Sequence, residues 1–307
     1  MSIAFLYAGQ GSQHPGMGAD LYETYPQFRA VLDGADLDFD VKEVSFQDSQ
    51  GVLNETRYTQ PCMVAFAVGV IQILNHEGIL PDYVAGLSLG EYSALQAAGV
   101  FTPQQAISLV AFRGKVMAEA AKGVPCGMTA VLGLDREKLE QACDEASALG
   151  VVCIANYNCP GQLVIGGHQE AVDEAARLAK EMGARRCMPL KVSGPFHTPL
   201  LKPAGDALAE KFKGETFGEM QVPVLFNCLG REMGPDDTIP ALLERQVQSS
   251  VYMEDTIRRL AELGVDTIVE IGPGKVLSGF VRKTTPEIKT YAVETVADVQ
   301  ALVQALK

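Results

Sequence analysis

The sequence is poor in basic residues relative to acidic ones, and this balance disfavours one class of partner. Lys and Arg number 25 against 38 Asp and Glu, which gives a formal net charge of −13 at pH 7. Nucleic-acid binding depends on neutralising phosphates, so no nucleic-acid partner is expected. Any acidic partner must find a local basic patch on this chain.

Cysteine pairs are also absent. Seven cysteines are present, and no two of them form a C-x-x-C pair. An odd and scattered set predicts reduced thiols in a cytoplasmic protein without a metal site. We interpret the cysteines as small buried hydrophobic residues rather than as nucleophiles.

Signals for export and for membrane insertion are missing as well. The N-terminal stretch Met1–Phe5 lacks a basic region and a cleavage site, and it predicts the start of the first core strand. No apolar run is expected to reach the length that spans a bilayer, so no membrane partner is expected. Apolar residues still make up 47% of the 307 residues, enough for a sizeable core.

One stretch carries the strongest chemical signal. Gly86-Leu87-Ser88-Leu89-Gly90 lies between a short apolar run and a run rich in Ala and Leu. This G-x-S-x-G pattern predicts a nucleophile elbow, a sharp strand-to-helix turn that presents a serine hydroxyl. The glycines suit a strained turn, and the N-terminus of the following helix favours negative charge nearby. The alternative is a serine in an ordinary turn.

Two glycine-rich loops fail as phosphate sites. The apolar strand Ile3–Tyr7 runs into a loop in which Gln10 stands between two glycines. The dinucleotide fingerprint would need a third glycine where the chain has His14. A P-loop around Lys275 fails because Val276 stands where Ser or Thr is needed. The first loop is then either a tight turn or a backbone that approaches another group closely.

Arg113 is unusual because it falls within the apolar stripe of a helix that Thr102-Pro103 begins. A buried arginine needs an anionic partner, since an unpaired buried charge is very costly. Its planar fork fits a carboxylate with two hydrogen bonds. A structural salt bridge and a substrate carboxylate both stay open at this point.

Histidine is scarce, which narrows the search for a base beside the serine. The chain has only four: His14, His76, His168 and His197. His76 at a helix end and His168 in a turn are expected to be inert, and His14 is a weak candidate. His197 lies in a loop where the chain returns to its larger domain, as a site loop would, so it is favoured.

The order of elements predicts an α/β protein of two domains. Residues 125–193 show the order strand-helix-strand-strand-helix-strand, with a turn at Asn158–Gly161, which is typical of a ferredoxin-like domain. We expect this small domain to be inserted into a large α/β-hydrolase-like domain with a parallel sheet, formed by residues 1–124 and 194–307. A buried helix is expected to begin at Pro61.

Together these motifs resemble the malonyl-CoA:acyl carrier protein transacylases and the wider acyltransferase domains of fatty acid and polyketide synthases. The resemblance covers essentially the whole chain. It rests on Gly9-Gln10-Gly11-Ser12-Gln13, Thr59-Gln60-Pro61, Gly86 to Glu91, Arg113, Asn158 to Gln162, Gly194 to His197, Gln246, and Glu270 to Lys275.

The resemblance implies a ping-pong transfer of malonyl from malonyl-CoA to the phosphopantetheine thiol of acyl carrier protein, without a cofactor. Ser88 would be the acylated nucleophile, with His197 as its base. A backbone carbonyl near Gln246 would orient the histidine. Backbone N–H groups of Gln10 and Leu89 would form the oxyanion hole.

The resemblance also implies how the acyl group is selected. Arg113 would bind the free carboxylate of the malonyl group, and Asn158 and Gln162 would line the site. The family usually has histidine where this chain has Leu87, so activity is expected to survive while the effect on acyl selectivity is open. Phe196 before the histidine resembles the malonyl-selective form of that motif.

Acyl carrier proteins are acidic, so docking implies a basic patch rather than ordinary solvated charges. The expected docking residues are Arg185, Arg186, Lys275, Arg282 and Lys283. The chain is expected to be a monomer that serves fatty acid synthesis.

Three alternatives stay open: a discrete acyltransferase of polyketide synthesis, an inactive carrier-binding module, and a serine thioesterase or hydrolase. The hydrolase would need a carboxylate between the serine and the histidine in the chain. Asp135, Asp144 and Asp173 are available there, but all three are expected on or near helices of the inserted domain.

Overall fold

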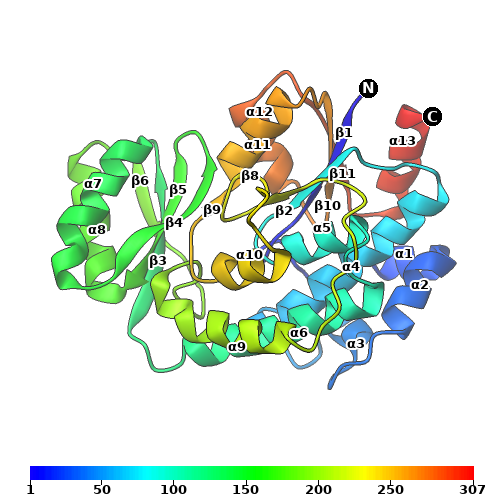
Figure 1. Ribbon diagram of the computed structural model, residues 1–307, viewed down its shortest axis with the longest axis horizontal. Coiled ribbons are helices and arrows are strands. Elements are labelled where there is room, and N and C mark those ends of the chain that lie inside the picture. The colour runs from blue at the N-terminus through cyan, green and yellow to red at the C-terminus, as the bar shows by residue number, and fades with distance from the viewer. The chain divides into compact units, whose positions relative to one another are not determined.

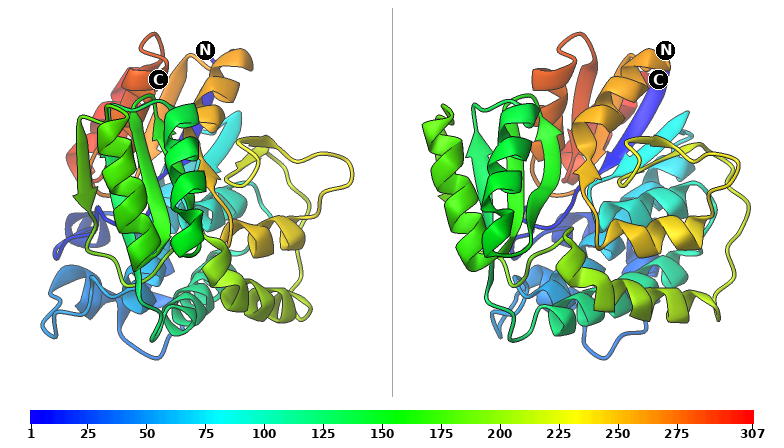
Figure 2. Two further views of the ribbon diagram at one scale, coloured as in Figure 1. Left: turned by 90° about the vertical axis from the view of Figure 1, so that its left-hand side faces the viewer. Right: turned by 60° about the vertical axis from the view of Figure 1, so that its left-hand side comes forward.

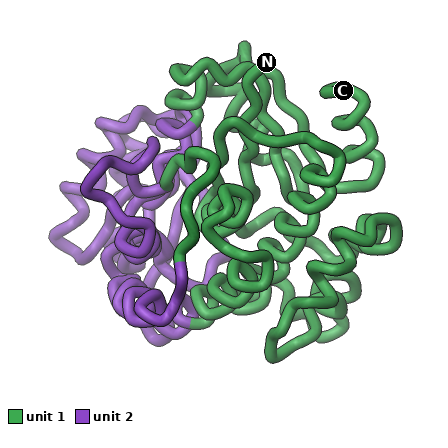
Figure 3. Tube along the Cα trace, turned by 45° about the vertical axis from the view of Figure 1, so that its right-hand side comes forward, with its two compact units in different colours: residues 1–115, 217–226, 257–307 green, residues 116–216, 227–256 purple.

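The computed structural model describes residues 1–307 as a mixed α/β protein (Figure 1). The chain divides into two compact units, shown in Figure 3. Unit 1 comprises residues 1–115, 217–226 and 257–307, and unit 2 comprises residues 116–216 and 227–256. The predicted domain bounds, with an insertion at 125–193, divide the chain differently and stay a prediction.

Unit 1 contains a parallel sheet whose strands lie in the order β11-β10-β1-β2-β7. The two central strands β1 and β10 are buried at every residue, as expected of parallel strands covered on both faces. The predicted parallel sheet is therefore confirmed. The strands are β1 (Ile3–Tyr7), β2 (Tyr83–Gly86), β7 (Val224–Phe226), β10 (Thr267–Ile271) and β11 (Lys289–Val293).

Helices pack against this sheet. In unit 1, α5 contacts β1 and β2, α4 contacts α5, and α12 and α13 contact β11. Helices α6 and α11 run across the division between the units. The helices are α1 (Ala19–Thr24), α2 (Pro26–Asp33), α3 (Val41–Phe46), α4 (Thr56–His76), α5 (Gly90–Ala97), α6 (Pro103–Ala120), α11 (Met253–Glu262), α12 (Val276–Thr284) and α13 (Val296–Leu306).

Helix α4 corrects two expectations from the sequence. It begins at Thr56 rather than at Pro61, which lies inside the helix. The Glu55 carbonyl accepts the N–H groups of Tyr58 and Thr59, so the first turn closes before the proline. The buried apolar side chains that follow outweigh the single hydrogen bond that a proline removes.

The same helix is long and apolar enough to cross a membrane, contrary to the expectation that no run reaches that length. However, 83% of its most apolar window is buried within the protein. That burial is the property of a core helix, and length and composition alone are weak evidence for a membrane span.

Unit 2 contains a second sheet, in the order β6-β3-β5-β4-β9. Its first four strands pair antiparallel, and β9 pairs parallel to β4. Helices α7 and α8 lie on one face of this sheet (Figure 2, left). The elements are β3 (Cys126–Leu132), α7 (Arg136–Ala146), β4 (Val152–Cys159), β5 (Gln162–His168), α8 (Gln169–Glu181), β6 (Arg186–Pro189), α9 (Lys202–Phe212), β8 (Arg231–Glu232), α10 (Ile239–Gln246) and β9 (Val251–Tyr252).

The predicted order strand-helix-strand-strand-helix-strand is confirmed between residues 126 and 189. The predicted turn at Asn158–Gly161 is too long, because Asn158 and Cys159 still belong to β4. Only Pro160 and Gly161 form the turn, and Gly161 has a φ of +68° that suits glycine. The sequence did not predict α1 to α3, α9, α10, α12, α13, β8, β9 or β11.

The core of unit 2 predicts how the unit responds to truncation of a side chain. Leu139 on α7 is 0% exposed, whereas Leu149, just after the same helix, is 53% exposed. Leu139→Ala should lower the free energy of unfolding by about 2–5 kcal/mol, because it leaves a cavity. Leu149→Ala, the control, should change it by less than about 0.5 kcal/mol. Urea unfolding followed by circular dichroism measures both, and equal losses would contradict this account of the core.

Candidate active site

The predicted strand-turn-helix around Ser88 is present. Strand β2 ends at Gly86 and helix α5 begins at Gly90 (Figure 1). Ser88 lies between them in the chain and has a φ of +55°. A Cβ at Gly86 would lie 2.0 Å from the carbonyl carbon of Gly90, and a Cβ at Gly90 would lie 2.4 Å from the Tyr7 carbonyl oxygen. Both positions therefore require glycine. A serine in the left-handed region is strained, which is a common mark of a functional turn.

Strand register brings the loop after β1 to this turn. Tyr7 pairs with Gly86, so the two parallel strands end at the same level. The Leu87 N–H donates to the Tyr7 carbonyl at 2.9 Å, and a Cβ at Gly9 would lie 2.8 Å from the Leu87 carbonyl oxygen. The loop that carries Gln10 is thus packed directly against the serine turn.

The same packing leaves two backbone donors available. Neither the Gln10 N–H nor the Leu89 N–H donates a hydrogen bond within the structure. The Gln10 side chain is held by the Thr56 hydroxyl, to which its Nε2 donates at 3.2 Å. Two available backbone N–H groups beside a strained serine are the components of an oxyanion hole.

Arg113 on α6 is fully buried, as predicted from the sequence. One guanidinium nitrogen donates to Gln60 Oε1 at 2.7 Å, and the other donates to Ser88 Oγ at 3.0 Å. The guanidinium carbon lies 5.7 Å from the centre of the Tyr92 ring, a cation–π geometry. Burial lowers the pKa of Arg113, while Tyr92 and Glu91 oppose that shift. Any carboxylate that this guanidinium binds would therefore lie beside the Ser88 hydroxyl.

The sequence analysis assigned no role to two of these neighbours. Gln60 appears only as part of a motif, although a polar side chain at the start of a buried apolar helix is a signal. Tyr92 stands four residues after Ser88, so both can face the same side of the turn. Neither its spacing nor its residue type indicated that it would lie over a guanidinium.

His197 lies in unit 2. It is buried and has a φ of +60°, and its Nδ1 lies 2.8 Å from the Gln246 carbonyl oxygen. Because a carbonyl can only accept, Nδ1 carries the proton and Nε2 is left as the basic nitrogen. The Thr198 hydroxyl donates to the Pro195 carbonyl at 2.6 Å and braces the loop.

The two units divide the predicted site residues. Unit 1 brings together Ser88, Arg113, Gln10 and Leu89, and it does so around the carboxyl ends of β1 and β2. Unit 2 brings together His197 and Gln246. It also holds Asn158, which is buried on β4, and Gln162, which begins β5.

A cavity of about 180 Å³ lies in unit 1 next to the serine turn. It is lined by the loop after β1, by the residue before the nucleophile and by the first turn of α12. The lining residues are Ala8, Gly9, Gln10, Gly11, Ser12, Leu87, Val276 and Leu277. The Glu270 carboxylate anchors this end of α12, because it accepts the N–H groups of Leu277 at 2.9 Å and Ser278 at 2.7 Å.

Three of the expected docking residues lie in or directly before α12. Lys275 precedes α12, and Arg282 and Lys283 lie seven and eight residues later, so the helical repeat places them on one side of it. All three are exposed. Arg185 and Arg186 are exposed at the start of β6 in unit 2.

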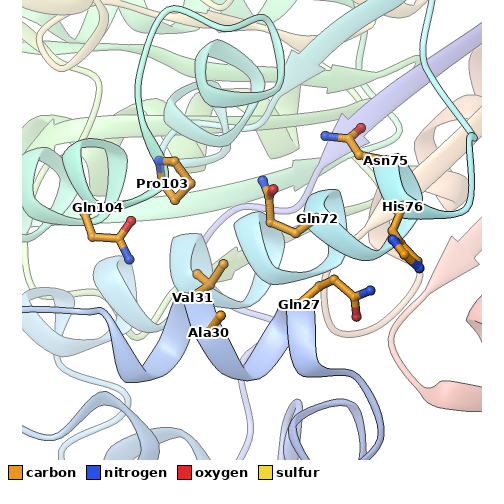
Figure 4. A pocket seen from close by; sticks show the side chains of 8 residues that line it. All are labelled: Gln27, Ala30, Val31, Gln72, Asn75, His76, Pro103 and Gln104. Carbon is orange, nitrogen blue, oxygen red and sulfur yellow. The ribbon is translucent and has the colours of Figure 1, made fainter.

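A larger cavity, of about 550 Å³, contains none of the predicted site residues (Figure 4). Its side chains come from α2, α4 and the start of α6, and they include four amides and His76 but no Lys, Arg, Asp or Glu. It offers no fixed positive charge to an anionic substrate. The lining residues are Gln27, Ala30, Val31, Gln72, Asn75, His76, Pro103 and Gln104.

The cysteines do not compete with Ser88 as nucleophiles. All seven are free, as expected, and four of them are buried. Burial raises the pKa of Cys62 and of Cys143 to about 12, and that of Cys153 to about 11. These thiols are therefore protonated near neutral pH, and a protonated thiol is a poor nucleophile.

Comparison with known proteins gives one consistent result. Residues 4–302 match the family model described as acyl transferase domain. A curated relative from Bacillus subtilis, named malonyl CoA-acyl carrier protein transacylase, is 42% identical over 99% of this chain and 97% of its own length.

Solved structures agree with the sequence match. The crystal structure of MCAT from Streptococcus pneumoniae has a TM-score of 0.95 and 46% identity, covering 99% of this chain and all of that one. A malonyl-transacylase solved with its type II polyketide synthase acyl-carrier protein has a TM-score of 0.95 and 37% identity, covering 99% of this chain and 100% of that one. Because these matches span almost the whole sequence, the chain belongs to the acyl transferase domain family.

Proposed function

We propose that this chain transfers the malonyl group from malonyl-CoA to the phosphopantetheine thiol of acyl carrier protein, in fatty acid synthesis. The observation that carries the proposal is the buried guanidinium of Arg113, which donates to the Ser88 hydroxyl. A malonyl group differs from an acetyl group by its carboxylate, and this is where a carboxylate would be held. The name of the relative from Bacillus subtilis supports the same activity.

In the first proposed step, Ser88 Oγ attacks the thioester carbon of malonyl-CoA while His197 Nε2 takes the hydroxyl proton. In the structure, Ser88 Oγ accepts a hydrogen bond from the Arg113 guanidinium. The Gln246 carbonyl keeps the imidazolium oriented through Nδ1. The oxyanion accepts from the Gln10 and Leu89 N–H groups, the carbon–sulfur bond breaks, and CoA leaves with the proton from the histidine.

In the second proposed step, His197 takes the proton of the phosphopantetheine thiol, and the sulfur attacks the malonyl-serine ester. The same two N–H groups hold the oxyanion. Ser88 Oγ then leaves with the proton from His197, which restores the free enzyme. Arg113 holds the malonyl carboxylate throughout and keeps the acyl carbon in reach of the thiol rather than of water. No cofactor takes part in either step.

The proposal includes finer assignments of structure and location. Within unit 2, the antiparallel order β6-β3-β5-β4 with both helices on one face supports a ferredoxin-like domain inserted at 125–193. The elbow and the parallel sheet support an α/β-hydrolase-like large domain, formed by residues 1–124 and 194–307. We assign Asn158 and Gln162 to the lining of the site. The chain would act in the cytoplasm as a monomer, and light scattering after gel filtration tests the oligomeric state.

A hydrolase with a serine-histidine-aspartate triad is not favoured. Its histidine would donate from Nδ1 to a carboxylate. Here Nδ1 of His197 is hydrogen-bonded to the Gln246 backbone carbonyl. Asp135 is the N-cap residue of α7, and Asp144 and Asp173 lie within α7 and α8.

Intact-protein mass after brief exposure to malonyl-CoA or acetyl-CoA tests the nucleophile and the carboxylate site. The wild type should gain one malonyl group, and Ser88→Ala should gain none, while Ser93→Ala, a buried serine on the same helix, should behave as the wild type. Arg113→Ala should be malonylated about 10- to 100-fold more slowly, the scale of a lost charged hydrogen bond, and should gain acetyl instead. Arg113→Lys should fall between them, because it keeps the charge without the fork. Release of free CoA without an adduct would identify a hydrolase. If neither an adduct nor free CoA forms, the proposal is contradicted entirely.

Steady-state kinetics with acyl carrier protein test docking on α12. Arg282→Glu with Lys283→Glu should raise the apparent KM for carrier protein roughly three- to tenfold, because reversed charges repel an acidic partner. Hydrolysis of malonyl-CoA should not change, and the effect should shrink at high salt. Lys211→Glu with Lys213→Glu, at the end of α9, is the matched reversal outside the proposed surface. Equal losses with both substrates, or equal effects of both reversals, would exclude docking on α12.

A further inference from the structure

One carboxylate joins three loops at the carboxyl ends of β1, β10 and β11. His14 Nε2 lies 2.6 Å from Glu294 Oε1, and Glu294 Oε2 accepts the Gly274 N–H at 2.9 Å. His14 belongs to the loop after β1, Gly274 to the loop after β10, and Glu294 follows β11. Each oxygen of Glu294 therefore holds a different loop, and the three residues form one clasp.

Two members of this clasp lie close in the chain to residues that line the cavity next to the serine turn. His14 is four residues beyond Gln10, and Gly274 is two residues before Val276, and both Gln10 and Val276 line that cavity. The loops after β1 and β10 pack closely against each other, because a Cβ at Gly272 would lie 2.4 Å from the Ala8 Cβ. In parallel sheets, ligands bind beyond the carboxyl ends of the strands. A change in the clasp would thus reach a proposed oxyanion donor and the first turn of α12 together.

The clasp contains a titratable group, the imidazole of His14. The hydrogen bond to Glu294 is the main cause that raises the pKa of His14 above its usual value of 6.5, with help from the Pro15 carbonyl and against a smaller effect of burial. The His14 side chain is 50% exposed, so it exchanges protons with solvent. The clasp should be fully formed below pH 6.5 and should weaken as pH rises through the raised pKa of His14.

Other charged groups lie near the clasp. The Asp298 carboxylate accepts the Glu294 N–H at 3.2 Å, and the Asp20 carboxylate accepts the Val296 N–H at 2.8 Å. Lys275 follows Gly274 directly in the chain. Among the charged groups near the clasp, His14 is the one whose pKa the surroundings raise from its usual value of 6.5.

We propose that His14 is a positioning residue for the transfer reaction. Paired with Glu294, its imidazolium fixes the segment Gly274–Val276, here called the wall, against the Gln10 loop. Loss of the His14 proton loosens that wall. The proposal rests on the function proposed above, because only then does the wall border the thioester. His14 itself touches no reacting atom. It acts through the hydrogen bonds of Glu294.

Transfer rates measured between about pH 6 and pH 9 test the positioning role. Below pH 6.5, His14→Ala should be about two- to fivefold slower than the wild type, the scale of one exposed ion pair, and the two should converge at alkaline pH. His14→Arg keeps a permanent charge, so it should match the wild type at low pH and exceed it at high pH. Glu294→Gln should resemble His14→Ala. His76→Ala, an exposed histidine at the end of α4, is the control and should match the wild type throughout.

The ratio of each variant's rate to the wild-type rate is the deciding quantity, because it cancels every pH effect that the two proteins share. A ratio for His14→Ala that does not depend on pH would show a merely structural role and overturn the proposal. The proposal would also be overturned if His14→Arg were slowed by the same factor as His14→Ala, relative to the wild type.

A second measurement does not depend on activity. In protein labelled with nitrogen isotope at glycine, the Gly274 amide resonance should follow the titration of the His14 ring in the wild type and should not move over that range in His14→Ala. If the Gly274 amide resonance follows the His14 titration but neither the wild type nor any variant transfers malonyl, the clasp is supported and the proposed function fails. If malonyl is transferred but Gly274 ignores His14, the clasp is wrong and the proposed function stands.

Discussion

The hydrogen bond from the buried Arg113 guanidinium to the Ser88 hydroxyl is the interaction on which the candidate site depends. A guanidinium without solvent is costly, so the surrounding helices must supply polar and aromatic partners. Gln60 on α4 and Tyr92 on α5 do so from either side. Holding this charge in place therefore ties α4, α5 and α6 together around one serine.

Steric constraints on the backbone place the serine opposite that charge. Gly86 and Gly90 are packed against each other and against the end of β1, at distances that no side chain could share. This packing holds Ser88 at a positive φ, and the buried central strands on either side keep the turn from relaxing. The same close approach brings the Gln10 loop to the turn. One local constraint thus sets the nucleophile and its candidate oxyanion donors together.

The cavity wall shows how surface chemistry can bear on this buried arrangement. The buried Glu270 carboxylate accepts two backbone N–H groups at the start of α12. The partly exposed Glu294 carboxylate accepts the N–H of Gly274, in the loop before that helix. The Glu270 carboxylate anchors the helix, because each of its oxygens accepts a backbone N–H group in a buried environment. The Glu294 carboxylate is paired with His14, a histidine that is accessible to solvent. Glu270 therefore anchors α12 itself, and Glu294 holds the loop that precedes it.

The sequence by itself determined what depends on local spacing. The G-x-S-x-G turn, the buried strand Ile3–Tyr7, the buried Arg113 and the order of elements between residues 126 and 189 were all predicted from patterns a few residues long, and the structure contains them. The start of α4 was predicted wrongly, because the packing of its apolar side chains outweighs the signal of a proline at a helix start.

Only the tertiary structure decided which distant residues meet. Arg113 finds Gln60 at a separation of 53 residues, and His14 finds Glu294 at a separation of 280. No periodicity encodes such pairs, because strand register and helix packing, not neighbouring residues, bring them within hydrogen-bonding distance. The sequence could name the nucleophile and the buried charge, but the geometry that joins them depends on the folded sheet.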